Sequence, residues 1–227
     1  MLKPKKKMSK HDLKDDKFVR FALQAKTYFD ENSKRVTMFV FGVFAVLSIM
    51  IIYSYINRQS QTAANGQLGI AQIEYSYGNY DKAAVRLHRL IDDYGGSDAA
   101  LQGTFLLANI YYQQKEYEDA RHYFEKFIDE YSGSTILLAS GYAGLASCYE
   151  IEDEYNQAAQ LYVKAANLAT DFTESDNYRY LAGICFKKAG DIEHAINQFE
   201  KLVDQSRPSS RAKDAESQLV LLNRNKK

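Results

Sequence analysis

The residues of this chain that could bind a metal ion are few and badly spaced for it. His88, His122 and His194 lie far apart in the sequence, and none stands four residues from another histidine or a cysteine. Isolated histidines of this kind are typical of a protein surface rather than of a metal site. The acidic stretch 150–154 lacks the Asp-x-Asp-x-Asp-Gly order of a calcium loop. We therefore expect no metal ion and no other cofactor.

Two thiols complete the candidates for chemistry. Cys148 and Cys185 stand 37 residues apart without CxxC spacing, in equivalent places of successive segments. This pattern favours small buried hydrophobic side chains, with a disulfide between the two as the alternative. The sequence contains no glycine-rich phosphate loop and no GxSxG elbow. These patterns predict a protein that is not an enzyme.

The segment that predicts the cellular location of the protein is an apolar stretch at residues 36–56. It has 21 residues without a charge, VTMFVFGVFAVLSIMIIYSYI. As a helix it would be about 31 Å long, which is enough to cross a bilayer. A buried core helix or a cleaved signal peptide fits less well, because no polar face interrupts the run and it is too long for a signal core. We expect a single transmembrane helix.

Charge is distributed unevenly around this segment. Residues 1–35 hold 11 basic and 5 acidic side chains, whereas residues 57–227 hold 18 basic and 24 acidic ones. The positive-inside rule then predicts a cytoplasmic N-terminus and an extracytoplasmic C-terminal part, which is the periplasm in a double-membraned bacterium. The chain would be a single-pass protein of the inner membrane. The acidic balance argues against nucleic acid as a partner.

Three short regions flank the apolar segment. Residues 1–15 are lysine-rich without hydrophobic periodicity and predict a disordered basic tail. Residues 16–34 carry apolar side chains at helical spacing and predict a cytoplasmic amphipathic helix, which would bind either the lipid surface or a cytoplasmic protein. Residues 57–63 are expected to be a linker.

An internal repeat organises the rest of the chain. Ala83, Ala120, Ala158 and Ala195 are 37, 38 and 37 residues apart, and each has a small residue twelve positions earlier (Ala71, Ala108, Ala146 and Gly183). A large apolar residue follows each alanine four positions later (Leu87, Phe124, Tyr162 and Phe199). Small residues at both positions let two antiparallel helices approach closely, and stacking of the pairs buries a continuous core. Gly78 and Gly190 are expected as left-handed helix ends, and Ser97 and Ser134 as N-caps.

These residues resemble the tetratricopeptide repeat. The resemblance implies an all-α protein in which a single transmembrane helix precedes a solenoid of about four repeats at residues 64–223. The usual first-helix tryptophan is absent, and the period exceeds the usual 34 residues. Residues 212–222 are expected to form a C-terminal capping helix, because Ala215, Leu219 and Leu222 share a face.

In the tetratricopeptide family the first helix of each repeat lines a concave groove, so the resemblance places a protein-binding site there. The candidate partner-binding residues are Tyr75, Phe105, Asn109, Tyr112, Gln113, Ser147, Tyr180, Ile184, Lys187 and Lys188. Aromatic rings and amides on one face could hold an extended or helical peptide. The alternative is that Tyr75 and Tyr112 belong partly to the core.

The layout of the whole chain resembles the YfgM-like ancillary subunit of the SecYEG translocon. The shared features are the stretch Tyr28-Phe29-Asp30-Glu31-Asn32-Ser33-Lys34, one span and the repeats after it. This resemblance implies a scaffold or chaperone-adaptor whose partners are translocon subunits, periplasmic chaperones or secreted clients. The alternative is a structural coordinator of cell-wall or outer-membrane assembly that works through homo-oligomers. An organelle import receptor is a third reading, which the lysine asymmetry opposes.

Overall fold

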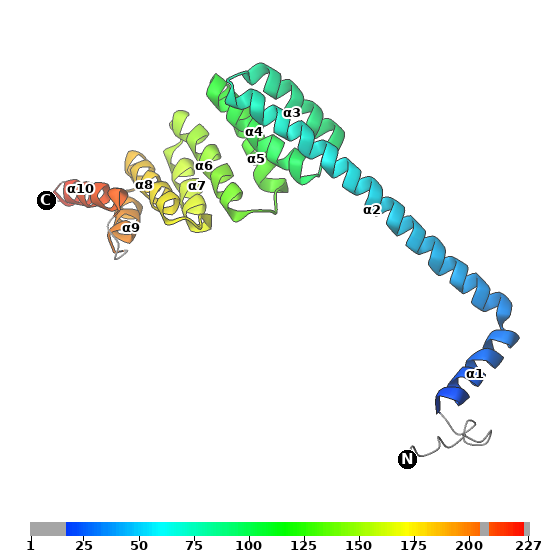
Figure 1. Cartoon of the computed structure of the whole chain (residues 1–227). Coiled ribbons are helices and arrows are strands. Elements are labelled where there is room, and N and C mark those ends of the chain that lie inside the picture. The colour runs from blue at the N-terminus through cyan, green and yellow to red at the C-terminus, as the bar shows by residue number, and fades with distance from the viewer. Residues whose placement is uncertain (1–16, 205–208, 225–227) are drawn as a thin grey trace, which may run out of the picture. The chain divides into compact units, whose positions relative to one another are not determined.

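The computed structural model describes residues 17–204 and 209–224, and every element in these ranges is an α-helix (Figure 1). The helices are α1 (Lys17–Glu31), α2 (Ser33–Ser76), α3 (Tyr80–Tyr94), α4 (Asp98–Gln114), α5 (Tyr117–Glu130), α6 (Thr135–Ile151), α7 (Tyr155–Leu168), α8 (Phe172–Lys188), α9 (Ile192–Val203) and α10 (Ser210–Arg224). The chain divides into two compact units, Met1–Gln59 and Ser60–Lys227. The predicted all-α repeat array is confirmed.

The first unit contains α1 and the beginning of α2. The helix α2 holds the whole predicted span and is long and apolar enough to cross a membrane, as in membrane anchors and signal sequences. In α1, Phe21 and Tyr28 of the amphipathic face are exposed. The tail at residues 1–15 lies outside the described residues.

The linker expected at residues 57–63 is not a separate segment. These residues are helical and belong to α2, which ends at Ser76 as the first helix of the first repeat. The physical reason is local: residues 57–63 contain neither glycine nor proline, so nothing in them interrupts a helix that the flanking residues already form.

In its described residues the second unit contains four helix pairs, α2/α3, α4/α5, α6/α7 and α8/α9, followed by the single helix α10. The four repeat alanines Ala83, Ala120, Ala158 and Ala195 are completely buried, as the repeat pattern predicts. The close approach is tight at Gly183, where an added Cβ would lie 2.5 Å from Phe199 Cε1. A side chain at this position would therefore push the two helices of the pair apart.

The turn inside each pair uses one backbone conformation. Gly78 and Gly190 have φ angles of +76° and +81°, as expected for left-handed helix ends. At the equivalent places of the middle repeats stand Lys115 and Asp153, with φ of 66° and 60°. Two residues without glycine's freedom thus hold a left-handed conformation because the helix pair imposes it.

The expected serine caps differ from each other. Ser97 accepts a hydrogen bond from the Ala100 backbone N–H at 3.1 Å and is a true N-cap of α4. Ser134 occupies the expected N-cap position of α6, but its side chain makes no capping hydrogen bond. Its own backbone N–H donates to the Tyr131 hydroxyl at 3.1 Å instead.

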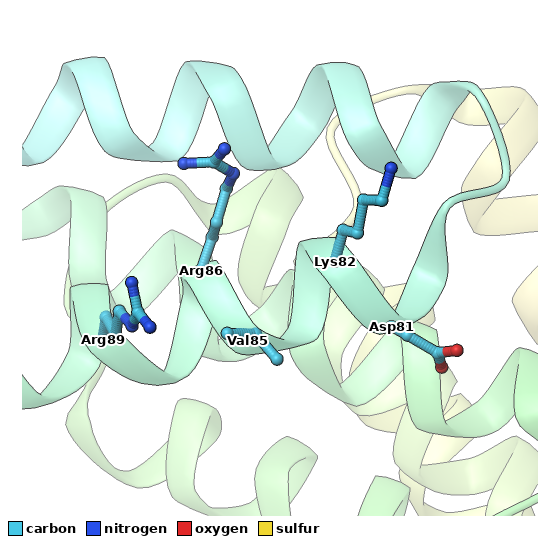
Figure 2. A pocket seen from close by; sticks show the side chains of 5 residues that line it. All are labelled: Asp81, Lys82, Val85, Arg86 and Arg89. Carbon is cyan, nitrogen blue, oxygen red and sulfur yellow. The ribbon is translucent and has the colours of Figure 1, made fainter.

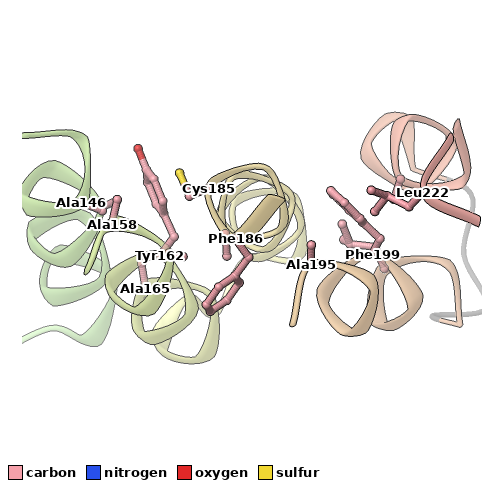
Figure 3. Packing of buried hydrophobic residues seen from close by; sticks show 14 residues of the cluster. Ala146, Ala158, Tyr162, Ala165, Cys185, Phe186, Ala195, Phe199 and Leu222 are labelled. Atoms are coloured by element: carbon pink, nitrogen blue, oxygen red, sulfur yellow. The ribbon is translucent and has the colours of Figure 1, made fainter. Parts of the chain in front are cut away.

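The last helix closes the hydrophobic core. Ala215 and Leu222 of α10 are buried in the same cluster as Phe199 of α9, with Leu219 packed against it (Figure 3). The predicted capping helix is therefore present. Its opposite side carries Val220 and Leu221, which are exposed.

Candidate protein-binding groove

The residues predicted for the groove come from four successive first helices, namely the end of α2, α4, α6 and α8. Gln113 and Lys188 are exposed, and the other eight side chains are half-buried. Half-burial lets a side chain rest on the core with one edge while its other edge can contact a ligand. The orientation of each side chain therefore depends on the residues that its buried part contacts.

The aromatic candidates rest on rings of the second helices. Tyr75 lies 5.4 Å from Tyr80 between ring centroids, and Phe105 lies 5.2 Å from Phe127. Tyr180 packs 5.8 Å from Phe199. Such ring pairs fix the aromatic side chains in place. The interpretation of Tyr75 as partly a core residue is confirmed, since it packs against the first repeat's core cluster.

Asn109 stands half-buried in the middle of α4. Its side-chain amide donates to the Phe105 carbonyl oxygen, one turn earlier, at 2.8 Å. Within the described part of the chain its Oδ1 has no hydrogen-bond donor. This bond orients the side chain and leaves one acceptor for the backbone N–H of a bound segment.

A chain of hydrogen bonds crosses α6 and α7. Ser147 Oγ donates to the Ala143 carbonyl at 3.0 Å and lies 2.9 Å from the Tyr162 hydroxyl. Tyr162 is almost fully buried, and its hydroxyl also lies 3.4 Å from Glu150 Oε2. Burial raises the pKa of Tyr162 well above its usual value. The phenol therefore stays neutral and can donate a hydrogen bond to either partner.

Glu150 continues this chain to α8. Its Oε1 lies 2.9 Å from Lys188 Nζ, and the hydrogen bond raises the pKa of Lys188. The same ammonium group stands 4.8 Å from the centroid of the Tyr155 ring. The Tyr155 hydroxyl donates in turn to Asp153. One lysine thus joins α8 to both helices of the preceding repeat.

Tyr112 of α4 lies near Ser147, the other end of this chain of bonds. Its ring packs 5.5 Å from Tyr117. Burial raises the pKa of Tyr112, and the nearby Ser147 side chain partly offsets the rise. The structure thereby brings together Tyr112, Ser147 and Lys188 from three successive first helices.

Other predicted residues are held differently. Lys187 donates to Gln218 of α10 at 2.7 Å, and Arg211 of α10 lies 4.8 Å over the Tyr180 ring. These two candidates therefore contact the capping helix. Ile184 packs against the buried cluster that contains Phe199.

Sequence reasoning overlooked Tyr155 and Tyr162, because both stand on second helices. A signal was present at Tyr162: it occupies the large apolar position that Leu87, Phe124 and Phe199 fill in the other repeats, and it alone carries a hydroxyl. A buried hydroxyl requires a partner, which Ser147 and Glu150 supply.

The two cysteines take no part in the groove surface. Cys148 and Cys185 are fully buried free thiols, and burial raises the pKa of each to about 12. The interpretation as small buried hydrophobic side chains is confirmed. In the described ranges, no group of three or more metal-binding side chains is found.

A pocket lies on α3, the second helix of the first repeat. This pocket of about 350 Å³ is lined by Asp81, Lys82, Val85, Arg86 and Arg89 (Figure 2). Figure 2 shows Lys82 and Arg86 pointing toward the neighbouring helix. The sequence signal was a basic stripe at spacings of four and three, which stands out in an acidic domain.

Helix pairs stacked around a continuous core, with a row of half-buried side chains on the first helices, define the helical-repeat scaffolds that bind other proteins. The chain belongs to the family of the tetratricopeptide repeat-like domain, whose model matches residues 26–220. The match begins before the apolar segment and ends within α10. No curated protein matches the sequence significantly.

Solved structures share the fold at low sequence identity. A tetratricopeptide repeat protein from Parabacteroides merdae aligns with a TM-score of 0.60 and 15% identity, covering 74% of this chain and 61% of that one. MamA aligns with a TM-score of 0.56 and 20% identity, over 69% of this chain and 84% of MamA. YrrB, described as having an unusual peptide-binding site, gives a TM-score of 0.51 and 18% identity, over 62% of this chain and 67% of YrrB.

Proposed function

We propose that this protein is a membrane-anchored interaction scaffold of the bacterial envelope and acts as a chaperone-adaptor beside the protein-export translocon. The family supports the scaffold role. The apolar stretch of α2 supports the anchor, and the lysine-rich N-terminus supports a repeat domain outside the cytoplasm. The layout shared with the YfgM-like proteins supports the place beside the translocon.

One observation carries the proposed mode of binding. Asn109, Tyr112, Ser147 and Lys188 present an oriented amide oxygen, a phenol, a hydroxyl and an ammonium group along three successive first helices. Such a row can take the backbone groups of an extended segment without requiring one particular side-chain sequence. A scaffold that meets many secreted clients needs this tolerance. The peptide-binding site described for YrrB agrees with this use of the fold.

Site-specific photocrosslinking in intact cells tests the proposal. A photoreactive residue at Gln113, which is exposed beside Asn109, should capture translocon subunits or periplasmic chaperones. The control is the same probe at His122, an exposed residue of the second helix α5, which should capture far less. Capture of wall-synthesis or outer-membrane assembly proteins alone would replace the export role with the envelope-assembly alternative.

A matched pair of variants distinguishes specific binding in the groove from nonspecific crosslinking. Asn109→Ala removes the amide oxygen and should weaken crosslinking from Gln113, whereas Asn156→Ala on the exposed side of α7 should not. Equal crosslinking in both variants would mean that the partner does not use the groove. A topology reporter fused after Arg224 tests the orientation separately, because an extracytoplasmic reporter is required for periplasmic partners.

A further inference from the structure

Among the helices that the structure describes, none precedes repeat 1 in the way that a second helix precedes each of the other three repeats. In repeats 2, 3 and 4 the first helix buries one face against the second helix of the preceding repeat. The buried residues on that face are Leu107 and Ile110 in α4, Leu145 and Cys148 in α6, and Ala182 and Cys185 in α8. The corresponding residues of α2 are Ile70 and Ile73, which are 41% and 55% exposed.

The glycines repeat the same contrast. An added Cβ at Gly103 would meet Leu90 Cδ2 of α3 at 3.0 Å, and one at Gly141 would meet Phe127 Cε1 of α5 at 2.7 Å. Gly66 occupies the equivalent position of α2, and no atom of the described residues lies within 4 Å of its Cβ site. Repeat 1 therefore has the small and apolar residues of a helix-packing face, and no helix of the described ranges covers it. We call Ala63, Gly66, Ile70, Ile73 and Tyr77 the end face.

The end face has the spacing of a parallel coiled coil. Its residues alternate at intervals of three and four, which are the a and d positions of a heptad. Upstream in the sequence the same spacing selects Gly42, Ala45, Ile49, Ile52, Ile56 and Gln59, of which only Gln59 is polar. Between residues 57 and 80, the large apolar side chains that are highly exposed are Ile70, Ile73 and Tyr77, and all three belong to the end face.

The flanking positions favour a copy of the same chain as the occupant. In a parallel homodimer, each g residue of one copy lies near the following e residue of the other copy, so like charges at these positions would repel. These positions within the repeat unit are Ser60, Thr62, Gln67, Gly69, Glu74 and Ser76, of which only Glu74 is charged. Glu74 Oε2 already accepts a hydrogen bond from Asn79 at 2.8 Å. Ala63 and Gly66 permit close approach, and the isoleucines fill the wider layers.

We propose that two copies of this chain pair in parallel through the end face of α2. The parallel direction rests on the membrane anchoring proposed above, because two anchored copies present the same residues at the same distance from the bilayer. The symmetry is closed, so the pairing stops at a dimer. The two grooves then lie on one two-chain scaffold, which can engage two segments of a client and gain avidity.

Cysteine scanning of the full-length chain in its membrane tests the pairing. Single cysteines at residues 63, 66, 70 and 73 should form same-residue disulfide dimers under mild oxidation. Cysteines at Asn65 and Gln72, which are equally exposed but point elsewhere on α2, are the matched controls and should not. The natural cysteines are fully buried and give little background, which the unsubstituted chain measures.

Three outcomes would overturn the proposal. The control positions could give as much disulfide-linked dimer as the end-face positions, or no position could give any. A disulfide-linked dimer at one position only would indicate antiparallel pairing. A second measurement does not depend on disulfides. Ile70→Asn with Ile73→Asn should shift the purified chain from dimer to monomer mass in sedimentation, with unchanged helix content by circular dichroism, because both side chains are exposed in the single chain. Ile70→Leu with Ile73→Leu should retain the dimer mass. A monomeric unsubstituted chain would contradict the pairing while leaving groove binding intact.

Discussion

The outer face of the first repeat and the buried junction between the first and second repeats carry similar residues at equivalent positions. One face is exposed, and the other is buried. Gly66, Ile70 and Ile73 are exposed, whereas Gly103, Leu107 and Ile110 in the same repeat positions are buried. The two faces differ because α4 packs against the second helix of the preceding repeat, whereas no described repeat precedes α2. In a solenoid, burial at a given position is therefore set by the neighbouring repeat and not by the residue type.

The internal junctions also show how size is balanced between neighbours. Gly103 faces Leu90 and Gly141 faces Phe127. At the next junction the pattern is reversed: the first helix carries Tyr178, and the position equivalent to Phe127 is Ala165, in the same cluster. Close packing thus requires one large and one small partner at each junction.

The largest expected effect is on folding stability. Leu107→Ala should lower the free energy of unfolding by about 2–5 kcal/mol, because it opens a cavity in a fully buried site. Ile70→Ala at the equivalent exposed position should change it by less than about 0.5 kcal/mol. Urea unfolding of both variants, at concentrations where the chain is monomeric, measures the difference. Equal losses would mean that α2 is covered within one chain.

Thiol reactivity should show the same contrast at one repeat position. Ile73→Cys corresponds to Cys148 and Cys185, whose pKa values burial raises to about 12. At pH 8, in the reduced protein at concentrations where the chain is monomeric, the introduced thiol should be alkylated quickly. Each natural thiol has about a thousandfold less thiolate than an ordinary cysteine. Mass spectrometry after a timed pulse of iodoacetamide counts the modified sites. Fast modification of Cys148 in the folded chain would contradict its burial.

The raised thiol pKa values also predict alkaline sensitivity. A group whose pKa is higher in the folded state stabilises the fold below its unfolded pKa and loses that contribution as pH rises through the folded one. For Cys148 and Cys185 the loss should run from about pH 9 toward pH 12. Urea midpoints across this range should fall less steeply in Cys148→Ala, after correction for the lower starting stability of that variant.

Exchange of glycine for alanine should act in opposite directions at the two faces. Gly141→Ala should destabilise the fold by about 1–2 kcal/mol, because the new methyl group meets Phe127 at 2.7 Å and outweighs the gain in helix propensity. Gly66→Ala should stabilise the monomer by up to about 1 kcal/mol, since its Cβ site is open. Thermal unfolding followed by circular dichroism compares them, and destabilisation at Gly66 would show an unseen contact.

The smallest expected effect concerns the polar chain of bonds between the two helices of repeat 3. Tyr162→Phe should cost about 0.5–1.5 kcal/mol, since it removes the hydroxyl that contacts Ser147 and Glu150. Ser147→Ala tests the same bond from the other side, and a double-mutant cycle should give less than the sum of the two losses. Additive losses would mean that the two hydroxyl groups act independently.

The amino-acid pattern was enough to predict the helix pairs, their period, the apolar span and the capping helix. Ala83, Ala120, Ala158 and Ala195 recur at a spacing that only stacked helix pairs explain, and all four are buried. The groove candidates could be named because they follow from the repeat register. The binding role of these ten residues stays a prediction.

Backbone conformations at the turns and contacts between distant residues depend on how the helices pack in space. The left-handed turns at Lys115 and Asp153 follow from the helix pair and not from the residue types. The contacts of Glu150 with Tyr162 and Lys188 join residues 12 and 38 positions apart in sequence. A repeat pattern specifies which residues share a helix face. What lies opposite that face depends on the next element in space, and so the exposed end face became visible only when its neighbours were placed.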